Sequence, residues 1–242
     1  MTGDKEHTMT LKAILFDLDG TLLDHDMRND FIPHYFALLS KHMAAWIPPD
    51  KLAPSVMRGA DAVTNNDGSR TNEEAFAEVF YPLIGYPRED MEPRFMDFYA
   101  RVFPALQQYT APKPEARLAV QTAFDKGYDV VIATNPHFPD IATQHRLAWA
   151  GVEDFPYHKV TTYENSHFAK PSLGYYQEIL DELECAAEDA LMIGDEAMDM
   201  VAAHLGCATF LIPGPATKME EIDPQPTYQG TLTDVIALLH TL

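Results

Sequence analysis

The chain has 242 residues, of which 37 are acidic and 17 basic, and its formal net charge at pH 7 is -20. This charge repels nucleic acids and anionic membrane surfaces, so we expect neither as a partner. The 46% content of hydrophobic residues is enough for a sizeable core, either in one large domain or in a core with a smaller second domain. Composition leaves the oligomeric state open.

The ends and the cysteines suggest an ordinary soluble protein. Cys185 and Cys207 are too few for a disulfide framework, and we expect them to be reduced and buried. Residues 1–10 contain Asp4 and Glu6 and no apolar signal region. No apolar run approaches the length of a membrane span, so the expected location is cytoplasmic.

The first predicted element is a buried strand, Ala13-Ile14-Leu15-Phe16, which ends at two carboxylates, Asp17 and Asp19. In open α/β sheets the reactive groups lie just beyond the carboxyl ends of such strands. Asp17 is therefore a candidate nucleophile. The alternative is that both residues only shape a turn, because Asp-Gly is itself a turn signal.

Residues 25–111 contain no strong strand pattern and at least three helix candidates. Residues 30–46 and 92–108 are long helix-permissive segments, and Thr71 with Glu74 matches a capping box. We expect a helical domain here, with His25, Arg28, Arg58 and Arg70 as candidates for substrate contacts. Phe31 and Tyr35 are expected in the core of this domain.

Strands and helices alternate in the rest of the chain. The expected elements are helix 114–126, strand 128–134, helix 138–150, strand 158–163, a helix from 172, strand 190–193, helix 197–205, strand 207–212 and helix 232–242. Such alternation requires parallel strands with right-handed crossovers and helices on both faces. The predicted fold class is α/β, a doubly wound and mostly parallel sheet, in which strand 158–163 lies nearer the edge.

We therefore predict two domains. The core domain comprises residues 1–24 and 112–242, and the inserted α-helical cap domain comprises residues 25–111. Residues 111–114, Ala-Pro-Lys-Pro, are the expected return hinge.

Four short motifs follow one another in a specific order. They are Asp17-Leu18-Asp19-Gly20-Thr21, Thr134 after an apolar run, Lys170-Pro171, and Gly194-Asp195-Glu196-Ala197-Met198-Asp199 after another apolar run. In this order they resemble the signatures of the haloacid dehalogenase (HAD) superfamily, most of whose members are magnesium-dependent phosphatases. The resemblance covers about residues 11–25 and 112–242. The insert resembles the cap of the C1 subgroup.

The resemblance implies a role for each matching residue. Asp17 would form an aspartyl-phosphate. Asp19 would act first as general acid and then as general base, and its backbone carbonyl would bind the metal. Thr134 through its hydroxyl, Asn135 through its backbone N–H and Lys170 through its charge would bind the phosphoryl oxygens. Without the resemblance, Thr134 would be an ordinary strand residue and Lys170 a solvated surface residue.

Asp195 and Asp199 are spaced so that both face one side, and with Asp17 they offer the hard oxygen ligands that Mg²⁺ prefers. Capping of a helix is the alternative for Asp195. Glu196 is expected to cap the helix or to face solvent. The predicted metal site thus comprises Asp17, Asp19, Asp195 and Asp199.

The expected function is magnesium-dependent hydrolysis of a small phosphorylated metabolite through an aspartyl-phosphate. The alternatives are a phosphomutase of a sugar phosphate and a non-catalytic metal-binding regulatory protein on the same scaffold. A dehalogenase is disfavoured because residues 19–21, Asp-Gly-Thr, follow the phosphatase pattern.

Overall fold

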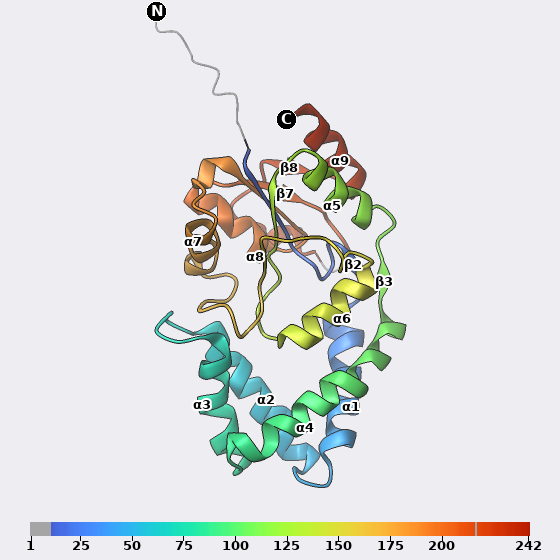
Figure 1. Ribbon diagram of the computed structural model, residues 1–242, viewed down its shortest axis with the longest axis vertical. Helices are drawn as coiled ribbons and strands as arrows, with labels where there is room; N and C mark the ends of the chain where they lie inside the picture. The colour runs from blue at the N-terminus through green and yellow to red at the C-terminus, as the bar shows by residue number, and fades with distance from the viewer. Residues whose placement is uncertain (1–10, 216) are drawn as a thin grey trace, which may run out of the picture.

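The computed structural model describes residues 11–215 and 217–242. The absence of a signal region predicted for residues 1–10 therefore lies outside the described residues. Figure 1 shows a sheet with its helices at one end of the molecule and a group of helices from residues 32–101 at the other.

Six strands form one sheet in which every neighbouring pair is parallel. They are β1 (Ala13–Phe16), β4 (Asp129–Ile132), β5 (Lys159–Val160), β6 (Ala190–Gly194), β7 (Ala208–Leu211) and β8 (Tyr228–Gln229). The order is β5-β4-β1-β6-β7-β8, so β1 lies in the interior and β5 at an edge, as its mixed polarity predicts. The α/β fold class is confirmed, and β8 is an edge strand that the sequence did not reveal.

Helices cover both faces of the sheet. The helices are α5 (Ala116–Asp125), α6 (Asp140–Ala150), α7 (Leu173–Glu182) and α9 (Leu232–Thr241). Ile14 and Phe16 pack into one apolar cluster with residues of α5, α6 and α9, while Ala13 and Leu15 pack into a second cluster with residues of α7. Because side chains alternate along a strand, β1 is buried on both faces, and this is why its sequence is a continuous apolar run.

The helix expected at residues 197–205 is divided into two. It begins as α8 (Ala197–Met200) and continues as a 3-10 helix, Val201–Leu205. Gly206 ends it in the left-handed conformation, with φ of 105°. A 3-10 turn is a common ending for a helix because the tighter winding satisfies its last carbonyl groups.

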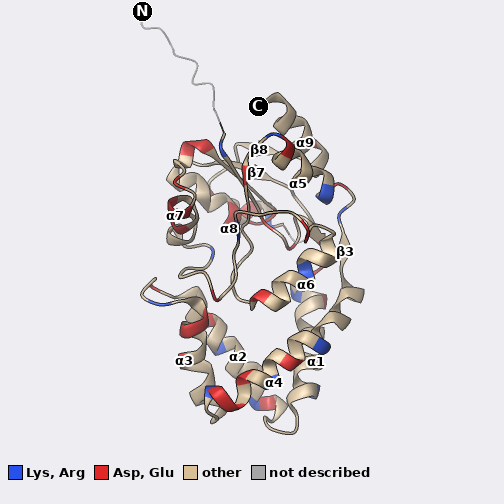
Figure 2. Cartoon of the chain, viewed as in Figure 1, with Lys and Arg blue, Asp and Glu red and all other residues tan. Residues whose placement is uncertain are grey.

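The insert contains four α-helices among the described residues. They are α1 (Ile32–Met43), α2 (Pro49–Thr64), α3 (Asn72–Ile84) and α4 (Arg88–Arg101), with a π-helix (Met27–Phe31) before them and a 3-10 helix (Phe103–Tyr109) after them. The predicted capping box starts α3: the Thr71 hydroxyl accepts from the Glu74 backbone N at 3.2 Å, and the Glu74 carboxylate accepts from the Thr71 backbone N at 3.0 Å. Figure 2 shows that the charged residues of α3 are all acidic, whereas α4 carries both acidic and basic residues.

The two segments through which the chain enters and leaves the insert lie side by side. The two-residue strands β2 (Leu23–Asp24) and β3 (Ala111–Pro112) pair antiparallel, with Leu23 opposite Pro112. They coincide with the predicted ends of the insert, whose status as a separate domain stays a prediction.

Trp149 of α6 joins the insert to the core. Its ring stacks on Phe103 with centroids 5.4 Å apart and lies 6.3 Å from the ring of Phe31. One apolar cluster therefore runs from Phe16 of the sheet through Trp149 into the helices of the insert. This contact lies beside the crossing strands, and a cavity opens between the insert and the carboxyl ends of the strands, as described below.

Candidate active site

Three carboxylates meet at the carboxyl ends of two neighbouring strands. Asp17 follows β1, Asp195 follows β6 and Asp199 lies in α8, and their side-chain oxygens come within 4.8 Å of one another. The backbone N of Asp17 donates to the Ile193 carbonyl at 2.8 Å, which extends the pairing of β1 and β6 to the site. The structure thus brings together three of the four predicted metal ligands through their side chains.

Lys170 lies between two of these carboxylates. Its Nζ donates to Asp17 Oδ1 at 2.8 Å and to Asp199 Oδ1 at 2.5 Å, and the side chain is almost fully buried. Burial by itself lowers the pKa of Lys170, but the negative charges of Asp17 and Asp199 outweigh burial and hold that pKa well above its ordinary value. Lys170 is therefore a fixed cation within the carboxylate cluster.

One lysine does not balance three buried carboxylates. Burial, opposed by the charge of Lys170 and reinforced by that of Asp199, raises the pKa of Asp17 to about 7. Burial followed by the charges of Asp17 and Asp199 raises the pKa of Asp195 to about 9. A divalent cation bound among these oxygens would relieve the repulsion, so the donor set fits a hard metal ion.

Two glycines allow this close approach. Gly20 has φ of +88°, and a Cβ atom there would lie 2.2 Å from Asp195 Oδ2. A Cβ atom on Gly194 would lie 2.2 Å from the carboxyl carbon of Asp199. A side chain at either position would displace a carboxylate of the cluster.

Backbone groups hold Asp199 in place. Its Oδ2 accepts from the backbone N atoms of Asp195 at 3.1 Å and Glu196 at 3.0 Å, which leaves Oδ1 for Lys170. Glu196 is the N-cap of α8, as expected, and its side chain accepts from the backbone of Asp199.

Asp19 lies beside the cluster with different partners. Its Oδ2 accepts from the Thr134 hydroxyl at 3.3 Å and from the guanidinium of Arg146. Nε2 of His25, whose side chain is fully buried, lies 3.5 Å from Asp19 Oδ1 without a hydrogen bond between them. Asp19 is thus surrounded by a hydroxyl, a guanidinium and an imidazole.

Arg146 is a site residue that sequence reasoning missed. It lies on α6, is only 1% exposed, and its guanidinium carbon lies 4.9 Å from the centre of the Phe138 ring. A signal was present, because Ala142, Arg146 and Ala150 are spaced four apart on the face of the predicted helix that faces inward. A charged residue on the apolar face of a helix indicates either a buried structural ion pair or a functional site.

The loop after β4 supports the other predicted residues. The carbonyl of Thr134 accepts from the hydroxyls of Thr161 at 2.7 Å and Tyr175 at 2.9 Å. The side-chain oxygen of Asn135 accepts from the backbone N of Lys170 at 3.2 Å, so Asn135 positions the segment that carries the lysine. The sequence did not reveal this contact.

The remaining candidates of the insert separate into two groups. Arg28 and Tyr35 line a cavity that also reaches Asp17 and Asp19. Arg58 and Arg70 are not among its lining residues, and Arg70 instead forms an ion pair with Glu78. Phe31 is buried in the apolar cluster as expected, and Tyr35 belongs both to that cluster and to the cavity wall.

Across residues 11–215 and 217–242, no helix combines the length and the apolar composition needed to cross a membrane.

The comparisons with known proteins agree with this geometry. A family model described as haloacid dehalogenase-like hydrolase matches residues 11–205. A phosphoglycolate phosphatase of Vibrio parahaemolyticus is 25% identical over 213 residues, which are 83% of this chain and 82% of that protein.

Solved structures share the fold. The crystal structure of a HAD phosphatase from Thermococcus onnurineus matches with a TM-score of 0.56 at 18% identity, covering 95% of this chain and 98% of the other. A putative beta-phosphoglucomutase from Thermotoga maritima matches with a TM-score of 0.57 at 16% identity, covering 96% and 100%. The family match spans most of the chain and includes the carboxylate cluster, and the chain therefore belongs to the haloacid dehalogenase-like hydrolases.

Proposed function

We propose that this enzyme is a phosphatase that hydrolyses a phosphate monoester through an aspartyl-phosphate on Asp17, with Mg²⁺ as cofactor. The observation that carries the proposal is the position of Asp17, a buried carboxylate at the end of β1, with Lys170 Nζ at 2.8 Å and two further carboxylates alongside. A nucleophile in this position approaches phosphorus in line, while cations neutralise the phosphoryl oxygens.

The proposed roles follow from the contacts of each side chain. Lys170 supplies a positive charge shared between Asp17 and the phosphoryl group. The Thr134 hydroxyl and the Asn135 backbone N–H donate to phosphoryl oxygens. Asp19 gives a proton to the departing alcohol and then takes one from the attacking water, and Thr134 and Arg146 hold its carboxylate in place.

Asp17, Asp195 and Asp199 would hold the metal, together with the backbone carbonyl of Asp19. The bound ion would supply positive charge against the phosphoryl oxygens and relieve the repulsion within the cluster. Mg²⁺ suits this donor set because it takes few carboxylate ligands and keeps several waters.

Residues 25–111 are proposed to act as a cap domain that covers the substrate, with the pair of β2 and β3 as the hinge. The insert contacts the core at two separate places, through the stacking of Phe103 on Trp149 and through Asn72, whose side chain donates to the Phe168 carbonyl at 2.9 Å. A substrate enclosed in this way reacts away from bulk water.

The test is phosphate release by the purified protein from p-nitrophenyl phosphate and from a panel of phosphorylated metabolites, with and without Mg²⁺. We expect magnesium-dependent turnover, which Asp17→Asn abolishes and Asp181→Asn, an exposed carboxylate on α7, does not affect. Turnover retained in Asp17→Asn would refute the nucleophile, and no turnover of any ester would favour a non-catalytic protein. A phosphomutase would instead yield an isomeric sugar phosphate without stoichiometric free phosphate.

A further inference from the structure

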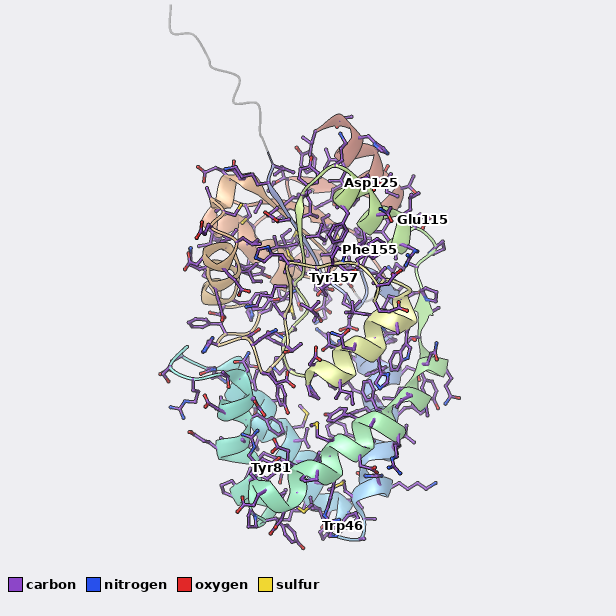
Figure 3. All side chains as sticks on the ribbon, viewed as in Figure 1. Trp46, Tyr81, Glu115, Asp125, Phe155 and Tyr157 are labelled. Carbon is purple, nitrogen blue, oxygen red and sulfur yellow. The ribbon has the colours of Figure 1, made fainter. Side chains whose placement is uncertain are left out.

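The cavity above the carboxylate cluster is large and mostly apolar. Its volume is about 400 Å³, and it extends from Asp17 and Asp19 into the centre of the helical insert. Figure 3 shows side chains with sulfur atoms among the helices of the insert, and it places Tyr81, which lines the cavity, toward the end of the insert that is far from the sheet. The apolar and aromatic residues of its wall within the insert are Met27, Ile32, Tyr35, Phe36, Leu39, Val56, Met57, Ala60, Phe76, Ala77, Phe80, Tyr81, Phe95, Met96 and Tyr99.

This volume exceeds what a small polar leaving group needs. At about 30 Å³ for each water in the liquid, the cavity has room for on the order of ten waters, and it falls in the range of pockets that enclose drug-sized ligands. Ordered water would find few polar partners along the aromatic wall formed by residues such as Phe36, Phe76 and Phe95. An apolar group that displaces this water gains the free energy of burial.

The cations that line the cavity already have anionic partners. Arg146 binds Asp19, and Arg28 Nη2 lies 3.5 Å from Glu196 Oε1. Arg88 binds both Glu73 and Glu92, the latter through Nε at 2.9 Å. Among the described residues, every arginine that lines the cavity is therefore paired with a carboxylate. None of these arginines is left unpaired for an anionic leaving group.

His137 adds no charge of its own. It lines the cavity near the site, and burial lowers its pKa to about 4, so its imidazole is neutral at physiological pH. At the end of the cavity within the insert, two carboxylates share the single guanidinium of Arg88, which leaves an excess of negative charge. A carboxylate on the substrate would lose its hydration there and meet like charge.

From this wall we infer that the substrate is a phosphate monoester of an uncharged alcohol with a large apolar, aromatic group, which the cavity of the insert receives. The inference rests on the proposed phosphatase function and names its substrate class. A bond forms between Asp17 Oδ and phosphorus as the ester P–O bond breaks, and the alcohol leaves with a proton from Asp19. Water then attacks phosphorus, returns a proton to Asp19, and releases inorganic phosphate and free Asp17.

The first experiment compares kcat/KM for four esters of primary alcohols, whose leaving groups carry no aryl oxygen. They are ethyl phosphate, 2-phenylethyl phosphate, 2-(4-carboxyphenyl)ethyl phosphate and 2-phosphoglycolate. We expect the phenylethyl ester to exceed the ethyl ester at least about tenfold, and its carboxylated analogue to lose about tenfold or more. A carboxylated or glycolate ester that equals or exceeds the phenylethyl ester would overturn the inference.

The second experiment fills the cavity. Ala77→Phe on α3 places a ring into the wall, and we expect the ratio of kcat/KM for the phenylethyl ester to that for the ethyl ester to fall about tenfold. Ala100→Phe, at an exposed position of α4 outside the wall, is the matched control and should leave the ratio unchanged. An unchanged ratio in a folded Ala77→Phe variant would show that the aromatic group does not enter this cavity.

The outcomes distinguish a wrong phosphatase function from a wrong substrate class. If none of the four esters, nor p-nitrophenyl phosphate, is hydrolysed in the presence of Mg²⁺, the phosphatase function itself fails. If ethyl phosphate or 2-phosphoglycolate is hydrolysed as well as the phenylethyl ester, the function stands and the assigned substrate class is wrong. Should Ala77→Phe fail to fold, the comparison of the four esters on the unmodified enzyme decides.

Discussion

The guanidinium of Arg146 donates a hydrogen bond to Oδ2 of Asp19, across 127 positions of sequence and from a side chain that is 1% exposed. The same oxygen accepts from Thr134 at 3.3 Å. A buried arginine with a carboxylate partner is strongly held, since an unpaired charge at this depth would be costly. The contact therefore fixes where the carboxylate of Asp19 lies relative to Asp17.

If this contact positions Asp19, replacing Arg146 should lower kcat more than it raises KM. We expect Arg146→Met to reduce kcat about a hundredfold, while Arg146→Lys, which keeps the charge but loses the planar fork, recovers part of the loss. Steady-state kinetics together with the thermal midpoint would separate this effect from destabilisation. Arg101→Met, at a mostly exposed arginine of α4, is the control. If Arg146→Lys and Arg146→Met lost kcat equally, Arg146 would have only a structural role.

Substitution of Asp17 and substitution of Asp19 should block different steps of the reaction. In Asp19→Asn, p-nitrophenyl phosphate should still phosphorylate Asp17, because its leaving group needs little protonation, and the phosphoenzyme should then accumulate. Rapid-quench measurement should show a burst of nitrophenol close to one equivalent, with the phosphoryl group on Asp17. Steady turnover by Asp19→Asn at the normal rate would contradict its assigned role.

Removal of divalent metal should abolish activity, and Mg²⁺ but not Ca²⁺ should restore it, since the longer and looser coordination of calcium misplaces the nucleophile. Asp195→Asn should chiefly raise the concentration of Mg²⁺ required. Asp199→Asn should also impair kcat, because Asp199 Oδ1 holds Lys170 at 2.5 Å. Titration of activity with Mg²⁺ in each variant distinguishes these outcomes, and full activity in chelator would refute the metal site.

Lys170→Met should cost orders of magnitude in kcat, because it removes a charge that stabilises the transition state. It also leaves the buried carboxylates of Asp17 and Asp199 without their cation, so we expect the metal-free variant to unfold at a lower temperature than the metal-free parent. Added Mg²⁺ should narrow this difference in thermal midpoint. Lys218→Met, at a half-exposed lysine near the C-terminus, should change neither quantity.

His137 should make the folded state less stable in mild acid. Burial lowers its pKa from 6.5 to about 4, so above pH 6.5 the folded and unfolded chains both carry a neutral imidazole. As the pH falls from 6.5 towards 4, the unfolded chain binds a proton that the folded chain does not, and the free energy of unfolding decreases. Denaturant unfolding at pH 7.5 and pH 5 should show a smaller decrease for His137→Gln than for the parent. His158→Gln, at a more exposed histidine, should behave as the parent does.

Much of the core could be predicted from the sequence because its signals are local. An apolar strand that stops at Asp17 is typical of a buried parallel strand, and alternating strands and helices require that the carboxyl ends of the strands meet at one edge. That rule alone places Thr134 and Asp195 near Asp17. The capping box at Thr71 is likewise a contact between residues three apart.

Other features depended on contacts between distant segments. Helical periodicity predicts α6 but does not say that the Arg146 side chain meets Asp19. Arg28 and Arg70 were candidates for substrate contacts, but the carboxylates that pair with them, Glu196 and Glu78, are set by packing. The sequence by itself determined the fold class and which residue types stand at the strand ends, since each is encoded within a few neighbouring positions. Only the tertiary structure decided which charges are paired and that the cavity is apolar, because both depend on which side chains from separate elements face the same space.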